Sequence, residues 1–240
     1  MAYINTTDTK IWTAEDPVEI SQKGLRQVQV KPKIGFDFAS AMRAFLRCDP
    51  DVIMLGEMRD RETASIGIEA SLTGHLVLST LHTNSAPESI TRLLDMGMDP
   101  FNFSDAILCI LAQRLVRTTC IHCREPYHLS KEAFEELVRE YGSSDQFEKH
   151  INIPYADDLI LNRPRGCERC YNTGYAGRMA LHELLLGTDE IKNLIQNSSP
   201  VEVIRNQAIK DGMNTLKQDG IAKIFSGYCD LFQIRKVCMR

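Results

Sequence analysis

The 240-residue sequence predicts an α/β fold: a parallel β-sheet with helices, then a lobe that contains paired cysteines, then a small helical C-terminal region. Three observations support this prediction. Apolar runs alternate with helical patterns over residues 10–116, as is typical of a parallel sheet. Two Cys-x-x-Cys pairs lie within residues 118–178. Glycine and proline divide residues 179–240 into short segments that read as helices. We therefore expect boundaries near residues 117 and 178.

The first elements are two short strands and a helix. Residues 9–20 open with an apolar run that stops at acidic residues and a proline, and residues 28–34 form a second extended segment. Between residues 38 and 46, apolar side chains recur at i, i+3, i+4, i+7 and i+8. This spacing predicts one buried helix face, and Asp49-Pro50 ends the helix.

A second group of elements repeats the strand-then-helix order. Val52–Leu55 is continuously apolar, which predicts a strand buried on both faces of a parallel sheet. Residues 60–72 predict a helix, and residues 75–84 repeat the pattern of an apolar run followed by polar residues. Ser85 and Glu88 form a capping-box pattern that begins the next helix, and a further helix is expected over residues 101–116.

Composition excludes several classes of protein. The net charge of −4 gives no overall basic field, so nucleic acid is not expected as a partner. No apolar run approaches the roughly 20 residues that span a bilayer, and the N-terminus lacks a signal-peptide pattern. We expect a cytoplasmic protein in a reducing compartment, with at most peripheral membrane contact.

Polar side chains follow three of the predicted strands. Glu15 and Asp16 follow the first, Glu57 follows the strand at 52–55, and His82 follows the next. Ligands bind at the carboxyl ends of the strands in open parallel sheets. Two carboxylates and an imidazole there suit metal-assisted attack on a phosphate, with one carboxylate for Mg²⁺ and one for water. The alternative is that each residue is structural, as expected for Asp60, which reads as a helix cap.

Several long motifs resemble one known family. "TAEDPVE" (13–19), "DPDVIMLGEMRD" (49–60) and "LTGHLVLSTLHTN" (72–84) resemble the Asp box, Walker B motif and His box of the type II secretion and type IV pilus assembly ATPases. The resemblance continues through 111–127 and 166–185, so it covers nearly the whole chain. It implies a partial RecA-like sheet. The two cysteine pairs favour the assembly-type members over the retraction-type relatives.

The resemblance also implies residue roles, ligands and partners. Glu15 would activate water, Glu57 would manage Mg²⁺, and His82 with Thr80 would sense the γ-phosphate of ATP. The full-length protein would be a homohexameric motor, peripheral to the inner membrane and docked on a platform protein there. The resemblance adds five further candidates for the nucleotide site. For the three arginines among them, the alternative role is a surface or interhelical ion pair. Those further candidates are Asp16, Arg43, Arg47, Arg59 and His75.

One part of a nucleotide site is missing from these residues. A phosphate-binding loop needs G-x-x-x-x-G-K-[ST], and the sequence has no Gly-Lys dipeptide. "MAYINTTDTK" resembles the end of the helix that follows this loop in the family. We expect the C-terminal part of a motor, with an unpaired sheet edge. Alone, this part should bind ATP weakly or not at all, so the sequence predicts neither the presence nor the absence of its own ATPase activity. The alternative is a catalytically inert, zinc-stabilised interaction module that assembles with a partner chain.

The paired cysteines predict a metal site. Cys120 with Cys123, and Cys167 with Cys170, present four thiolates, which suit tetrahedral Zn²⁺ in a closed structural site. A thioredoxin-like redox pair is the alternative. The surrounding arginines are either a solvated surface or a docking site for the membrane-platform protein. These are Arg114, Arg117, Arg124, Arg163, Arg165 and Arg169.

Overall fold

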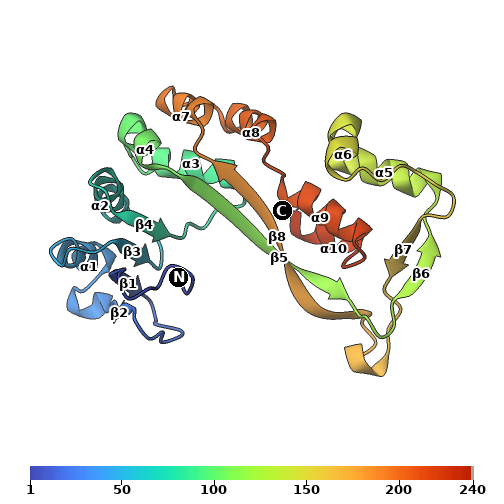
Figure 1. Cartoon of the computed structure of the whole chain (residues 1–240), viewed down its shortest axis with the longest axis horizontal. Coiled ribbons are helices and arrows are strands. Elements are labelled where there is room, and N and C mark those ends of the chain that lie inside the picture. The colour runs from blue at the N-terminus through green and yellow to red at the C-terminus, as the bar shows by residue number, and fades with distance from the viewer. Residues whose placement is uncertain (239–240) are drawn as a thin grey trace. The chain divides into compact units, whose positions relative to one another are not determined.

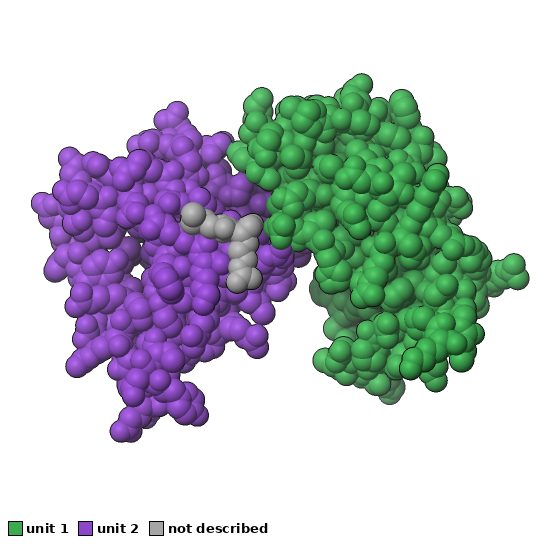
Figure 2. Space-filling model, turned by 180° about the vertical axis from the view of Figure 1, so that it is seen from behind, with its two compact units in different colours: residues 1–110, 186–211 green, residues 111–185, 212–240 purple. Residues whose placement is uncertain are grey.

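The computed structural model describes residues 1–238 (Figure 1), and they form two compact units (Figure 2). The first unit contains Met1–Ile110 and Leu186–Asp211. The second contains Leu111–Leu185 and the chain from Gly212 onward. The three-part division expected from the sequence stays a prediction.

A four-stranded parallel sheet forms the centre of the first unit (Figure 1). The strand order is β2-β1-β3-β4, so β2 and β4 are the edges of this sheet within residues 1–238. The register aligns Ala14 with Leu55, and Leu55 with Ser79. The predicted α/β fold with a parallel sheet is confirmed. The strands are β1 (Ile11–Glu15), β2 (Arg26–Gln29), β3 (Val52–Leu55) and β4 (Leu76–Ser79).

The two apolar strands β3 and β4 differ in burial. In β3, Val52, Ile53 and Leu55 are buried, as the continuous apolar run predicts. In β4, Leu76 and Leu78 are each 36% exposed. The sheet packs against α1 and α2 through a core of buried apolar side chains. This core contains Ala14, Val30, Ala41, Met42, Phe45, Ile53, Leu55 and Ala70.

Several helices of the first unit begin at side-chain caps. Asp37, Asp60 and Ser85 each accept a hydrogen bond from the backbone N–H three residues later. These bonds satisfy N–H groups that a helix start leaves unpaired, and they confirm Asp60 as a cap. The helices are η1 (Pro32–Ile34), α1 (Phe38–Phe45), α2 (Arg61–Leu72), α3 (Ala86–Asp95), α4 (Pro100–Ala106), α7 (Asp189–Gln196) and α8 (Val201–Lys210).

The second unit has its own core, in which Phe147, Leu181, Ile221 and Ile234 are fully or almost fully buried. Strands β5 and β8 pair with each other, and β6 pairs antiparallel with β7. The elements are β5 (Cys109–Thr119), β6 (Glu125–His128), α5 (Lys131–Tyr141), α6 (Ser144–His150), β7 (Ile160–Arg163), η2 (Glu168–Cys170), β8 (Tyr175–Leu186), α9 (Leu216–Phe225) and α10 (Leu231–Cys238).

Two predicted helical segments are strands. The helix expected over 101–116 ends at Ala106, and the chain continues as β5. Residues 179–186, expected to be helical, form the end of β8. The helices that follow, α7 to α10, are separated by the predicted glycines and proline. No helix within residues 1–238 combines the length and apolar composition needed to cross a membrane.

Candidate functional site

The carboxyl ends of β1, β3 and β4 lie side by side on one edge of the sheet. The register places Glu15, Gly56 and Thr80 at the same level. Backbone hydrogen bonds continue at this edge, from Gly56 N to Ala14 O (2.7 Å) and from Met58 N to Thr80 O (3.0 Å). From the sequence, the polar groups that follow these three strands would meet if the strands were neighbours, and the structure shows that β1, β3 and β4 are neighbours. We call this edge the strand-tip edge.

Glu57 is a buried carboxylate at the strand-tip edge, only 8% exposed. Its Oε2 atom lies 3.1 Å from His82 Nε2 and forms an ion pair with Arg59 Nε. The side chains of Arg59 and His82 are 70% and 81% exposed. The structure therefore brings three predicted site residues together, and the two basic groups sit on the solvent side of the carboxylate.

Glu15 is held by two neighbours that the sequence analysis missed. Its Oε1 atom accepts hydrogen bonds from Thr13 Oγ1 (2.5 Å) and Gln27 Nε2 (3.0 Å). Gln27 also donates to the backbone oxygen of Ile20 (3.0 Å), so the loop between β1 and β2 holds the amide. Thr13 was detectable, because i and i+2 share one face of a strand. Gln27 was not, because its contact depends on which strand pairs with β1.

Two further candidates, Thr80 and His75, lie at opposite ends of strand β4. Thr80 lies at the strand-tip edge, and its hydroxyl donates to Gly56 O (2.5 Å). His75 precedes β4, with Nδ1 3.0 Å from Ala70 O and 3.2 Å from Thr73 Oγ1. The structure therefore gives His75 a place in the turn after α2, at the far end of β4 from Glu57. The functional roles of both residues stay predictions.

The remaining candidates lie on the surface. Arg43, on α1, forms an ion pair with Glu62 at the start of α2. This contact matches the interhelical ion pair that the sequence offered as an alternative role. Arg47 and Asp16 are exposed, just after α1 and β1 respectively. The structure does not bring Arg43 into contact with Glu57.

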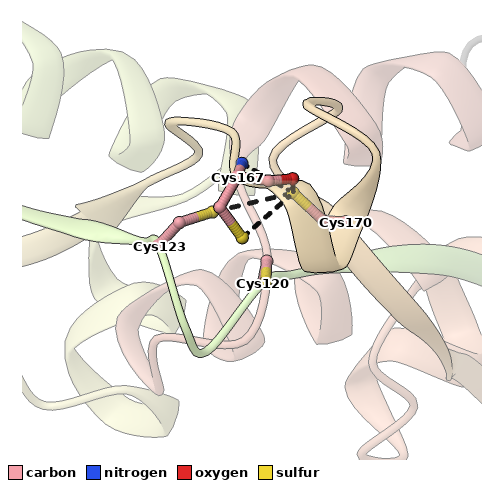
Figure 3. A group of neighbouring side chains, drawn as sticks. All are labelled: Cys120, Cys123, Cys167 and Cys170. Carbon is pink, nitrogen blue, oxygen red and sulfur yellow. Dashed lines mark hydrogen bonds between the residues drawn. The ribbon is translucent and has the colours of Figure 1, made fainter.

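The cysteines of the two pairs come together in the second unit (Figure 3). Their four Sγ atoms lie within 4.8 Å of one another, and Cys170 Sγ is 3.8 Å from Cys123 Sγ and from Cys167 Sγ. Four sulfurs bound to one tetrahedral Zn²⁺ at about 2.3 Å lie about 3.8 Å apart. The donor set and its spacing therefore fit a tetrahedral metal ion. We call this group, which also includes Cys120, the four-cysteine cluster.

Backbone N–H groups point at the sulfurs of the four-cysteine cluster. Gly166 N donates to Cys123 Sγ (3.3 Å), and Gly174 N donates to Cys170 Sγ (3.3 Å). Both glycines have a positive φ, of 116° and 78°, which side chains disfavour. A Cβ at Gly174 would also lie 2.6 Å from the Cβ of Pro164. Glycine is therefore required where the loops approach the sulfurs.

The local environment shifts two thiol pKa values in opposite directions. Burial raises the pKa of Cys123 to about 11. Burial also acts to raise the pKa of Cys170, but hydrogen bonds from the N–H groups of Cys167 and Gly174, together with those from the Cys167 and Cys123 thiols, outweigh it and lower the value to about 6. N–H donors favour the thiolate, which is the form that binds a metal. Cys170 therefore sits in the environment of a metal-binding thiolate.

Comparison with known proteins identifies the family. Residues 1–236 match the family described as Type II/IV secretion system protein. The chain belongs to this family. This result confirms the resemblance carried by the three motifs at the strand ends and by the cysteine pairs.

Curated members of this family resemble the chain over almost its whole length. A type IV pilus assembly ATPase PilB from Thermus thermophilus is 46% identical over 231 residues, which are 96% of this chain and 25% of that protein. A type II secretion system ATPase E from Vibrio cholerae is 42% identical over 234 residues, which are 98% of this chain and 44% of that protein. The chain thus spans between a quarter and somewhat under half of these relatives.

Two solved ATPase structures support the fold. The pilus retraction motor PilT with bound ADP aligns with a TM-score of 0.64 and 27% identity, over 98% of this chain and 55% of that one. The ATPase DotB of Legionella pneumophila also gives a TM-score of 0.64, at 22% identity, over 99% and 54%. The second likeness concerns the fold alone.

Proposed function

We propose that this chain forms part of a motor ATPase in which ATP hydrolysis powers type IV pilus assembly or type II protein secretion. The supporting observation is the strand-tip edge, where β1, β3 and β4 end side by side and Glu57 contacts both His82 and Arg59. Relatives over 40% identical are named as ATPases of these two systems.

Each group at the edge has a proposed role. Glu15, oriented by Thr13 and Gln27, activates the attacking water by accepting its proton. Glu57 holds Mg²⁺, which neutralises charge on the phosphates of bound ATP. His82 and Thr80 contact the γ-phosphate, and exposed arginines are suited to phosphate oxygens because the guanidinium binds them bidentately. Asp16 and His75 remain candidates for contacts around the nucleotide.

The proposed assembly is a homohexamer on the cytoplasmic side of the inner membrane, with a platform protein of that membrane as its partner. The four-cysteine cluster is the proposed site of a structural Zn²⁺ ion, which would cross-link two loops of the second unit. Such an ion supplies folding free energy and needs no open coordination position. Its four ligands come from one unit of one chain, so metal binding does not require the hexamer.

ATP binding provides the first test. The sequence has no Gly-Lys dipeptide and hence no Walker A lysine, so the 240-residue chain should bind a fluorescent ATP analogue weakly. We expect no saturation below about 0.1 mM, which corresponds to less than about 5.5 kcal/mol of binding free energy. Saturable binding at low micromolar concentration would contradict this expectation.

The decisive experiment supplies the missing loop. A protein that joins a family segment with G-x-x-x-x-G-K-[ST] to this chain should hydrolyse ATP. Glu15→Gln and Glu57→Gln should each lower kcat about 10²-fold to 10⁴-fold, because each removes a group used in proton transfer or metal binding. Glu69→Gln, on the exposed side of α2, is the matched control and should leave kcat unchanged. The motor proposal fails if the joined protein folds without ATPase activity.

A second candidate function rests on the contrast between the two sites. The four-cysteine cluster is complete within this chain, whereas the strand-tip edge has no phosphate-binding loop beside it in the sequence. This favours a catalytically inert, zinc-stabilised interaction module that assembles with a partner chain. Such a module would remain inactive when the loop is supplied, yet would keep its metal and its partner.

A further inference from the structure

Two segments around the four-cysteine cluster carry a net charge opposite in sign to that of the whole chain. Residues 117–128 and 163–178 contain six arginines, two glutamates and no lysine, whereas the whole chain has a net charge of −4. Zn²⁺ on four thiolates would add two negative charges and still leave an excess of about two positive ones. All six arginines are exposed. They are Arg117, Arg124, Arg163, Arg165, Arg169 and Arg178.

Apolar side chains project from turns within these two segments. Ile121 follows Cys120 and is 71% exposed, and Tyr171 follows Cys170 and is 89% exposed. A guanidinium nitrogen of Arg169 lies 3.0 Å from His122 Nδ1, so it bridges the two loops. We call Ile121, His122, Arg169 and Tyr171, with the exposed arginines around them, the knuckle surface. Its apolar groups stand on loops tied together by the cysteines.

Most of the surrounding arginines are held in place by contacts within the second unit. Arg163 and Arg165 pair with Glu125 at 3.3 and 3.1 Å, and Arg124 donates to Gly227 O at 3.0 Å. Arg169, in contrast, contacts an imidazole rather than a carboxylate. Within residues 1–238, Arg178 forms no ion pair with a carboxylate. These two guanidinium groups can therefore pair with carboxylates from outside.

The composition of the knuckle surface is that of a protein interface. Tyrosine and arginine are enriched at such interfaces and dominate their binding energy, whereas lysine is depleted. Guanidinium groups bind carboxylates bidentately, which a lysine ammonium cannot do. An anionic membrane would attract lysine and arginine alike, so arginine without lysine favours a protein.

We propose that the knuckle surface is a docking site for an acidic protein. Its partner would place a carboxylate against Arg169, and an apolar hollow over Ile121 and Tyr171. The inference deepens the partner part of the proposed function and rests on it. It makes no use of ATP chemistry. A failure of peptide binding would therefore contradict only this inference, and a failure of ATPase activity would contradict only the motor proposal.

The test selects short peptides from a random display library on the purified, zinc-loaded chain. The enriched peptides should combine Asp or Glu with an aromatic or aliphatic residue. Their affinity should fall about tenfold or more in Arg169→Glu and in Tyr171→Asn. Asparagine is chosen because residue 171 has φ 52°, a conformation that asparagine tolerates.

Two matched variants control for charge and for apolar exposure. Arg139→Glu makes the same charge change at an exposed site on α5 of the same unit. Ile20→Ala is the control for a third variant, Ile121→Ala, since these isoleucines are 70% and 71% exposed. Both controls should bind peptide like the parent chain. Zinc content and circular dichroism should match the parent in every variant.

Three results would overturn the proposal. The first is a selection dominated by basic peptides, or an equal loss of binding in the control variants. The second is that no acidic peptides are selected, while the chain binds phosphatidylglycerol vesicles and Arg169→Glu abolishes this binding. That result would assign the surface to a membrane. The third is concentration-dependent dimerisation that the same variants abolish, which would make a second copy the occupant.

Discussion

The strand-tip edge and the four-cysteine cluster both gather polar groups from distant parts of the sequence, but they do so differently. In the four-cysteine cluster, all four ligand atoms lie within 4.8 Å and converge on one point. At the strand-tip edge, Glu15 is held by Gln27 and Thr13, whereas Glu57 is held by Arg59 and His82. The first is a complete ligand set for one ion. The second is a set of separately oriented groups, which the function proposed above would connect through a nucleotide.

This difference reflects the two ways in which the backbone sets up each site. Glycines with positive φ bring N–H groups close to the sulfurs, so the loops themselves are shaped around the cluster. At the strand-tip edge, the parallel pairing fixes only where each strand ends, and the contacts come from side chains that range from the buried Thr13 to the exposed Arg59. We therefore expect substitutions at the cysteines to affect stability strongly and substitutions near the strand tips to affect it weakly.

The largest effect is expected from removing the four-cysteine cluster. The double variant Cys123→Ser, Cys167→Ser should bind no zinc, because two ligands are lost, and structural zinc can contribute about 10 kcal/mol or more of folding free energy. Hydrogen exchange should show loss of protection in residues 117–128 and 163–178, with protection of the β1–β4 sheet retained. Chelation of the parent chain should give the same pattern.

The exposed Cys109 provides the control for the cysteine variants, and Cys109→Ser should leave zinc content and exchange unchanged. Full protection of both loops in the metal-free double variant would show that the cluster is not needed for folding. That outcome would remove the main difference between the two sites.

An intermediate effect is expected from Glu140, which joins α5 to α9 and α10. It accepts hydrogen bonds from Lys217 Nζ (2.8 Å) and Arg235 Nη2 (2.9 Å), and these contacts lower its pKa. A carboxyl whose pKa is lower in the folded state stabilises the fold above its unfolded value of about 4.3, and this contribution is lost as pH falls through the folded pKa. Glu140→Gln should therefore cost about 1–3 kcal/mol at neutral pH.

Urea unfolding of Glu140→Gln and of the parent chain should show this difference at neutral pH, and the difference should shrink as the pH falls below the unfolded value of about 4.3. Glu135→Gln, at an exposed position on the same helix, should change little at either pH. A difference that is equal at both pH values would mean that packing, rather than charge, explains the effect of Glu140.

The smallest effect on stability is expected at Arg43. Its ion pair with Glu62 joins side chains that are 52% and 59% exposed, so Arg43→Ala should change the free energy of unfolding by less than about 1 kcal/mol. Glu62→Ala breaks the same ion pair but keeps the guanidinium. Both variants can also be made in the protein that carries the added phosphate-binding loop. If Arg43 contacts phosphate there, Arg43→Ala should lose ATPase activity and Glu62→Ala should keep it. Equal ATPase activity in the two variants would mean that Arg43 serves only the ion pair with Glu62.

Much of the fold was predictable because its signals are local. The apolar run Val52–Leu55, the caps Asp60 and Ser85, and the two cysteine pairs each follow from a few neighbouring residues. Strand β5 was missed for an equally local reason. Ile107, Leu111 and Leu115 are spaced by four, and residues four apart share a face in a strand as well as in a helix.

The site was predictable only in part. The types of residue at the three strand ends indicated the strand-tip edge, but the contacts of those residues depend on packing between elements. Gln27 reaches Glu15 only because β2 pairs with β1, and Arg43 meets Glu62 only because α1 lies beside α2. The same holds for His75, whose motif suggested a nucleotide contact but whose bonds close a turn at the other end of β4.

The exposed edge strand β4 has a consequence for handling the protein. Among the residues that the structure describes, no strand pairs with its outer side, and Leu76 and Leu78 are each 36% exposed. An apolar edge of this kind is a template for any extended chain, including the same strand of another molecule. We expect the 240-residue chain to aggregate with time at high concentration. A lysine in place of Leu78 should slow this, because a charge on an edge strand opposes stacking.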